Sequence, residues 1–191
     1  MAAAGVLASA ALLLSFNPAV VAFADSVRSG DAAAAALAVT ESLGDSSVHA
    51  QAGNPAASSR VNAYGGRTLA TGGSNTQTLT FTNTGTAPVA ALTGTGSPCA
   101  QTAIDRTAGP ATDLCDKVSV LIASGGVTIF EGTARAFGRS GAIDVLASSG
   151  VGSVAPGESV RVTITITLSP SLDNSYQGLQ ISQPIQWRFS A

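Results

Sequence analysis

The feature that most constrains the fold is a strict alternation of apolar and polar residues over positions 159–168, SVRVTITITL. Because successive side chains of a strand point to opposite faces, this pattern predicts a half-buried β-strand. An apolar face of this length must be covered by a second layer of secondary structure. The residues expected on that face are Val160, Val162, Ile164, Ile166 and Leu168.

Shorter segments elsewhere repeat this alternation. It is clear at Leu79 and Phe81, and again at Ile185, Trp187 and Phe189 near the end of the chain. Many short alternating strands are typical of an all-β fold, here a jelly-roll-like antiparallel β-sandwich with short helical turns. Besides 159–168, we expect strands at residues 76–83, 87–92, 118–123, 127–131 and 184–191, with the third and fourth forming a hairpin.

Glycine and proline mark the expected connections. Residues 155–157 predict a turn, and residues 53–75, rich in Gly, Ser, Asn and Ala, predict a loop. Residues 169–173 predict the start of a short helical turn, with Ser169 as its cap and Pro170 at its first position.

The composition excludes some classes of function. Charged residues make up 10% of the chain, against about 25% in an average domain, and the net charge is −2. A basic surface for nucleic acid is therefore not expected. Apolar residues make up 45%, enough for one domain with a core.

The first 24 residues resemble an export leader. Residues 2–24 carry no charge, residues 7–16 are largely apolar, and Ala22 and Ala24 fit the small-x-small motif of signal peptidase. We expect a signal-peptide helix over 1–24, with the mature chain beginning at Asp25. An uncleaved membrane anchor is the alternative, and, since no basic residue precedes the apolar run, a start upstream of Met1 is left open.

The mature chain divides into two parts. Residues 25–53 are Ala-rich, and the pattern at 32–39 fits a helix or a strand equally well. This segment is expected to be the first strand of its own sheet, a surface helix, or a strand donated to a neighbouring subunit. Residues 54–191 are expected to form the sandwich domain.

Cys99 and Cys115 are the only cysteines. An even pair in an exported chain predicts a disulfide, and two unpaired thiols are the alternative. Their spacing excludes a redox CxxC motif.

The sequence contains no recognisable catalytic or metal-binding motif, so we expect no enzyme activity, no metal and no cofactor. His49 is the only histidine, and neither HExxH nor GxSxG occurs. A glycosidase carboxylate pair is left open, while Asp113 and Asp116 are interpreted as loop-capping or solvent-exposed rather than as calcium ligands. The loop aromatics available for binding a partner are Tyr64 and Phe137.

Four stretches resemble the TasA/camelysin family of exported proteins of Gram-positive bacteria, in an actinobacterial form. They are AFADSVRSGDAAAAALAV, TLTFTNTGTAPV, the Leu114-Cys115-Asp116 element with the strand after it, and APGESVRVTITITLSPSLDNSYQG with the aromatic terminal strand. The resemblance implies a secreted jelly-roll domain that polymerises into biofilm-matrix or surface fibres. Some relatives are called metalloproteases, which one histidine without HExxH does not support.

We therefore expect a secreted or cell-surface structural subunit. Its expected partners are further copies of itself and signal peptidase, and it would contact a membrane only through the uncleaved leader. An adhesion or binding module is the first alternative, and a camelysin-type metalloprotease is the second.

Overall fold

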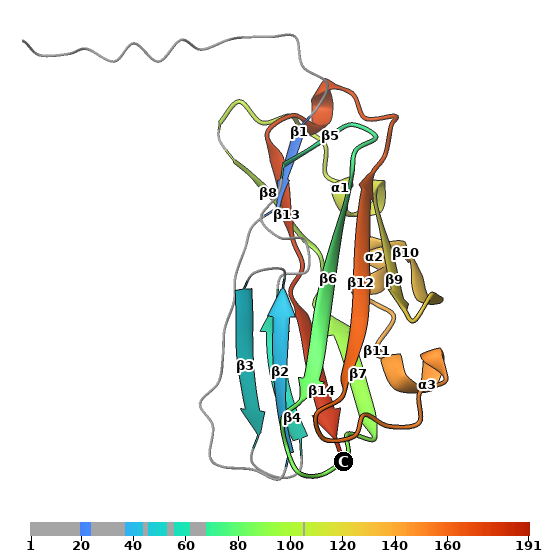
Figure 1. The fold of residues 1–191 in the computed structure, drawn as a ribbon. Coiled ribbons are helices and arrows are strands. Elements are labelled where there is room, and N and C mark those ends of the chain that lie inside the picture. Colours follow the sequence, from blue (N-terminus) through green and yellow to red (C-terminus); the bar gives the residue numbers. More distant parts are fainter. Residues whose placement is uncertain (1–19, 24–36, 44–45, 53–55, 62–67, 105) are drawn as a thin grey trace, which may run out of the picture.

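In the computed structural model the chain forms an all-β antiparallel sandwich with short helical turns, as predicted (Figure 1). The structure describes residues 20–23, 37–43, 46–52, 56–61, 68–104 and 106–191, with side chains from residue 68 onward. No helix in these ranges is long and apolar enough to cross a membrane.

One layer is a six-stranded sheet with the order β10-β9-β12-β6-β2-β3. The predicted strand of 159–168 is its central strand β12, which pairs with β6 on one side and β9 on the other. The sheet consists of β2 (Leu37–Leu43), β3 (Ser46–Ala52), β6 (Ser74–Asn83), β9 (Val118–Ser124), β10 (Val127–Thr133) and β12 (Ser159–Leu168).

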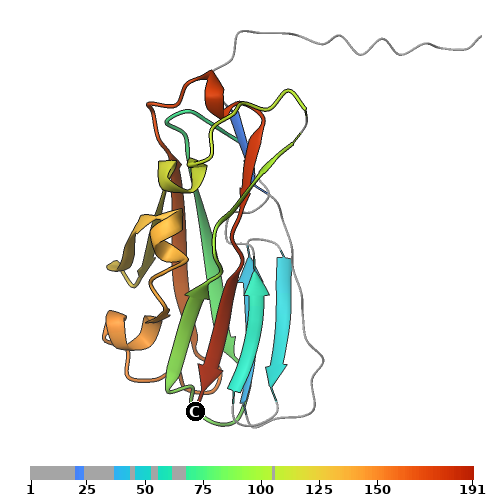
Figure 2. The ribbon, with the colours of Figure 1, turned by 180° about the vertical axis from the view of Figure 1, so that it is seen from behind.

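The second layer consists of two four-stranded sheets, β11-β7-β14-β4 and β5-β1-β13-β8. They follow each other along the molecule because β14 continues β13 and β8 continues β7 (Figure 2). Their strands are β1 (Val20–Phe23), β4 (Ala56–Val61), β5 (Thr68–Ala70), β7 (Ala91–Gly96), β8 (Ala100–Ala103), β11 (Ala142–Asp144), β13 (Leu179–Ser182) and β14 (Ile185–Ser190).

The helical turns are short. Three of them lie beside β9 and β10 and cover that side of the sandwich (Figure 1). They are α1 (Leu114–Lys117), α2 (Ala134–Phe137) and α3 (Val145–Ser149), and a 3-10 turn, η1 (Asn174–Tyr176), lies at the end near β1.

The core lies between the layers and centres on aromatic rings. Trp187, Phe189 and Phe81 are buried, and the Phe81 ring centroid lies 5.1 Å from that of Trp187 and 5.5 Å from that of Phe189. All five apolar residues predicted to face inward from β12 are buried. The alternation therefore gave both the strand and its buried face correctly.

The outer face of β6 and β12 carries hydroxyl groups. Ser74 pairs with Thr167, Thr76 with Thr165, and Thr82 with Ser159, each at 2.8 Å. Together with the exposed Arg161, these hydroxyl groups keep the face polar.

Three local predictions were wrong. Residues 53–75 are not one loop, because β4, β5 and the start of β6 lie within them. The second short strand is β7, after an isolated bridge at Val89, rather than 87–92. The helical turn does not begin at Ser169: it is η1, and Asp173 caps it by accepting from the Ser175 N–H at 2.9 Å.

The N-terminal predictions have mixed outcomes. Residues 20–23 of the expected leader helix form strand β1, and residues 1–19 and 24 lie outside the described residues. Residues 37–43 and 46–52 form β2 and β3, which lie in the sheet of the sandwich rather than outside it. Cleavage after Ala24 stays a prediction.

Replacing Ile164 by Asp should destabilise the domain by more than about 3 kcal/mol, since an unpaired charge would enter the core. Replacing Thr165 by Asp should cost less than about 1 kcal/mol, because its side chain lies on the outer face next to Thr76. Thermal and urea unfolding of the two variants measure the difference. Equal losses would contradict the register of β12.

Candidate assembly site

The candidate site is the end of the sandwich formed by β5, β1, β13 and β8, together with the loops around them. Strand β1 lies between two others: it is parallel to β13 and antiparallel to β5. Ala22 stands opposite Gln180 on one side and Thr68 on the other, and Phe23 stands opposite Ile181. A segment of the predicted leader thus fills a central position in a sheet.

The chain beyond β8 is tied to the loop before β13 by main-chain bonds. The Ile104 N–H donates to the Gly178 carbonyl at 2.8 Å, and the Ala111 N–H donates to the Ser175 carbonyl at 3.0 Å. Gly109 lies so close to this loop that a Cβ there would overlap the Ser175 carbonyl. The close approach of two backbones explains the glycine.

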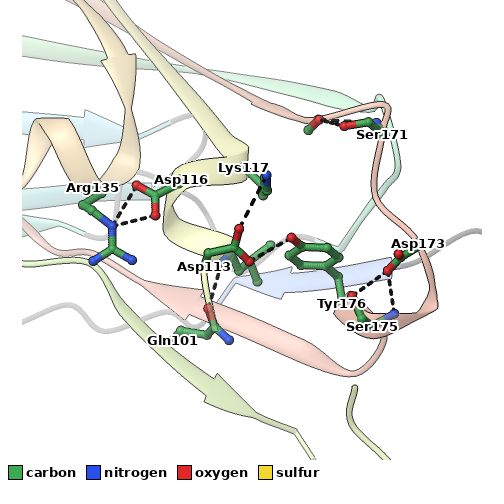
Figure 3. Close-up of polar contacts among 11 residues, drawn as sticks. Gln101, Asp113, Asp116, Lys117, Arg135, Ser171, Asp173, Ser175 and Tyr176 are labelled. Atoms are coloured by element: carbon green, nitrogen blue, oxygen red, sulfur yellow. Dashed lines mark hydrogen bonds and ion pairs between the residues drawn. The ribbon is translucent and has the colours of Figure 1, made fainter. Parts of the chain in front are cut away.

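The disulfide between Cys99 and Cys115 closes the base of the loop that connects β8 to α1. The prediction of the pair is confirmed, with 6.1 Å between the two Cα atoms. Gln101 adds a second connection, because its side chain donates to the Ala111 carbonyl at 2.5 Å and accepts from the Leu114 N–H at 2.8 Å. Two connections therefore join the start of the loop to its end, and Figure 3 shows the position of Gln101 in one of them.

Tyr176 and Asp113 join η1 to the segment before α1. The Tyr176 hydroxyl donates to Asp113 Oδ1 at 2.8 Å, and Lys117 Nζ lies 3.5 Å from Asp113 Oδ2 (Figure 3). The bond to the carboxylate raises the pKa of Tyr176 to about 12, and the same bond lowers the pKa of Asp113 below its ordinary value.

Asp116 makes a separate contact, accepting from Arg135 Nε at 2.7 Å. Neither aspartate caps a helix, since the residue before α1, Asp113, makes no side-chain cap bond. Both side chains are partly exposed to solvent, as the solvent-exposed alternative predicted, and each is also bound to a partner. Among the described residues, no group of three or more His, Cys, Asp and Glu is arranged to hold a metal ion.

The other candidate residues do not gather at this end. Phe137 is fully buried in the core and therefore offers no binding surface, while Tyr64 and Ala24 lie outside the described residues. His49 lies in β3 opposite Thr40.

A small apolar cavity lies in the core among Phe81, Asn83, Val89, Leu92, Val154, Val160 and Phe189. Its volume of about 10 Å³ matches the space of about one water molecule. It is too small for an organic ligand.

Sequence reasoning did not identify Tyr176, Gln101 or Gly109 as parts of this end. Each acts through a partner more than nine residues away in the chain, and a single sequence gives no signal of such a pairing. Among the long-range contacts at this end, the cysteine pair was the one that the sequence predicted.

Replacing both cysteines by serine should lower the free energy of unfolding by about 3 kcal/mol, because the cross-link closes a short loop. The core should still fold. Urea unfolding measures the loss, and unchanged stability would contradict a structural role for the disulfide.

Replacing Tyr176 by Phe should reduce the loss of folding stability at alkaline pH. The pKa of Tyr176 is raised in the folded state, so its contribution is fully present below its ordinary value of 10.0 and is lost as the pH rises toward about 12. The native protein should therefore lose more stability between pH 9 and pH 12 than the variant does. Melting temperatures across this range give the comparison; parallel curves would contradict the bond to Asp113.

No protein-family model matches this sequence, and no curated protein matches it. The resemblance to the TasA/camelysin family therefore stays a prediction that rests on the four stretches quoted above.

Proposed function

We propose that this protein is an exported structural subunit that self-associates into extracellular or cell-surface fibres by strand addition. The observation that carries the proposal is the place of β1. It belongs to the predicted leader, yet it pairs with strands on both sides. Cleavage after Ala24 would take a strand out of the middle of a sheet.

Loss of β1 would leave two unpaired strand edges facing each other. Strand β5 has β1 as its one neighbour in the sheet, and β13 would keep only β8. Unpaired backbone groups at such edges need new partners. We name the space between β5 and β13 the β1 slot.

A strand from a second copy would satisfy both edges of the β1 slot. Strand addition gains its affinity from main-chain hydrogen bonds, and apolar side chains at alternate positions add specificity. The donor would be the start of the mature chain, before β2, since residues 37–43 are paired in the chain's own sheet. Head-to-tail donation does not close on itself and therefore produces a filament.

The remaining surface suits such a role. The outer face of β6 and β12 carries three hydroxyl pairs, and the far end of the domain is packed around Trp187. An adhesion or binding module is the alternative function, and the buried position of Phe137 does not favour it.

Secreted protein should begin at Asp25, as N-terminal sequencing or intact mass would measure. A mature protein that keeps residues 12–14 would favour the membrane-anchor alternative instead.

A chain starting at Asp25 should form filaments, whereas one starting at Leu37 should fold and stay monomeric. The shorter chain keeps β2 whole but lacks the proposed donor. Light scattering and electron microscopy of both proteins measure assembly, and Trp187 fluorescence measures folding. Filaments of the shorter chain would refute donation from this segment; an unfolded shorter chain would show that the segment belongs to its own core.

A further inference from the structure

The predicted cleavage site begins inside a sheet. Ala22 and Phe23, the third and second residues before the predicted scissile bond, are paired in β1, and Ala24 follows directly. A peptidase must take this segment into its own active site as accessible chain. Residues held between β5 and β13 are not accessible in that way.

We propose that β1 is an autoinhibitory strand of the precursor. While it occupies the β1 slot, the folded precursor resists signal peptidase and is closed to strand addition. The second consequence rests on the proposed function, whereas the first depends only on the position of β1. Cleavage would then require that β1 has not yet paired, or that it leaves the sheet.

The pairing of β1 suits a reversible contact. It spans four residues, and its neighbour β5 spans three. Short elements at the end of a domain open locally at a small part of the total unfolding free energy. By contrast, β12 and β6 are each ten residues long and pair along nearly their whole length.

The neighbouring part of the interior contains buried polar atoms that make no hydrogen bond to the described residues. Asn75 and Gln77 lie on the inner face of β6, in line with buried Leu79, near the point where β6 follows β5. The Asn75 Nδ2 and Gln77 Oε1 atoms are buried and have no hydrogen-bond partner in the part of the chain that the structure describes. Buried polar groups without partners cost free energy that is recovered in water. Opening this end would therefore recover the free energy lost at these two atoms; Trp187 Nε1, in the core around β14, is a third such atom.

The cleavage step itself is ordinary hydrolysis. Water adds across the Ala24–Asp25 peptide bond, leaving a carboxylate on Ala24 and an amine on Asp25. After the bond is broken, β1 is no longer held near its slot by the chain, and its effective concentration there falls. The slot then becomes free for another strand.

The test compares cleavage of the full-length chain, folded in mild detergent, with cleavage of the same chain unfolded in urea at a concentration that signal peptidase tolerates. The cleavage rate of the folded precursor should be at most about one tenth of the rate of the unfolded chain. Replacing Leu69 by Pro should raise the rate for the folded precursor toward that of the unfolded chain, because Leu69 pairs with Val21 and lies outside the cleavage motif.

The matched control is Thr102→Pro. Thr102 lies on β8, at the opposite edge of the same sheet, and pairs with Gln180 of β13 rather than with β1. This variant should keep the slow cleavage of the native precursor. Equal acceleration by both prolines would show that general loosening of the sheet, and not release of β1, controls the rate, and would overturn the proposal.

Hydrogen exchange on the native precursor gives a second measurement, and it does not depend on the folding of any variant. Amides of residues 20–23 should exchange at least about tenfold more slowly than in the unfolded chain. Exchange at the unfolded rate, or cleavage of the folded precursor as fast as the unfolded one, would overturn the proposal. Neither measurement depends on filament formation. The proposal of autoinhibition can therefore be tested even if the protein does not self-associate.

Discussion

The fold depends on the packing of one indole ring between two sheets. Trp187 of β14 is fully buried and contacts Phe81 of β6, which joins the layers. The ring fits because Gly94 stands opposite it on β7; a Cβ there would lie 2.5 Å from the ring atom Cζ3. A second glycine, Gly96, leaves room for Phe137 in the same way, with 2.6 Å to the ring atom Cε1. Large rings on β14 and α2 are thus matched by the absence of side chains at two positions of β7.

The sequence predicted the fold where burial alternates with exposure. The alternation at 159–168 and at 185–189 is visible without knowing the partner strand, because each segment carries its own inward and outward faces. The 118–131 hairpin was equally predictable from the sequence, since its turn glycines at 125 and 126 adopt positive φ. Local chemistry was enough in these places.

The prediction failed where the structural role of a residue depends on a partner elsewhere in the chain. The strand expected at 87–92 stopped short of the Thr-Gly-Thr-Gly segment of β7, whose glycines face inward and leave room for Trp187 and Phe137. The helical turn lies at η1 rather than at Ser169, since Asp173 supplies the cap. The candidate site was predictable only through its two cysteines, because its other contacts join loops far apart in the chain.

The continuity of β13 and β14 has a mechanical consequence. Between them, the buried Gln183 side chain donates to the Ser97 carbonyl at 2.9 Å and to the Ala134 carbonyl at 2.7 Å, and the Pro184 carbonyl accepts from the Ser97 N–H at 2.9 Å. Tension applied to a strand held beside β13 would pass along one unbroken chain to β14. There it would load the β7 and β4 ladders in shear, so that many hydrogen bonds resist at once instead of opening one after another.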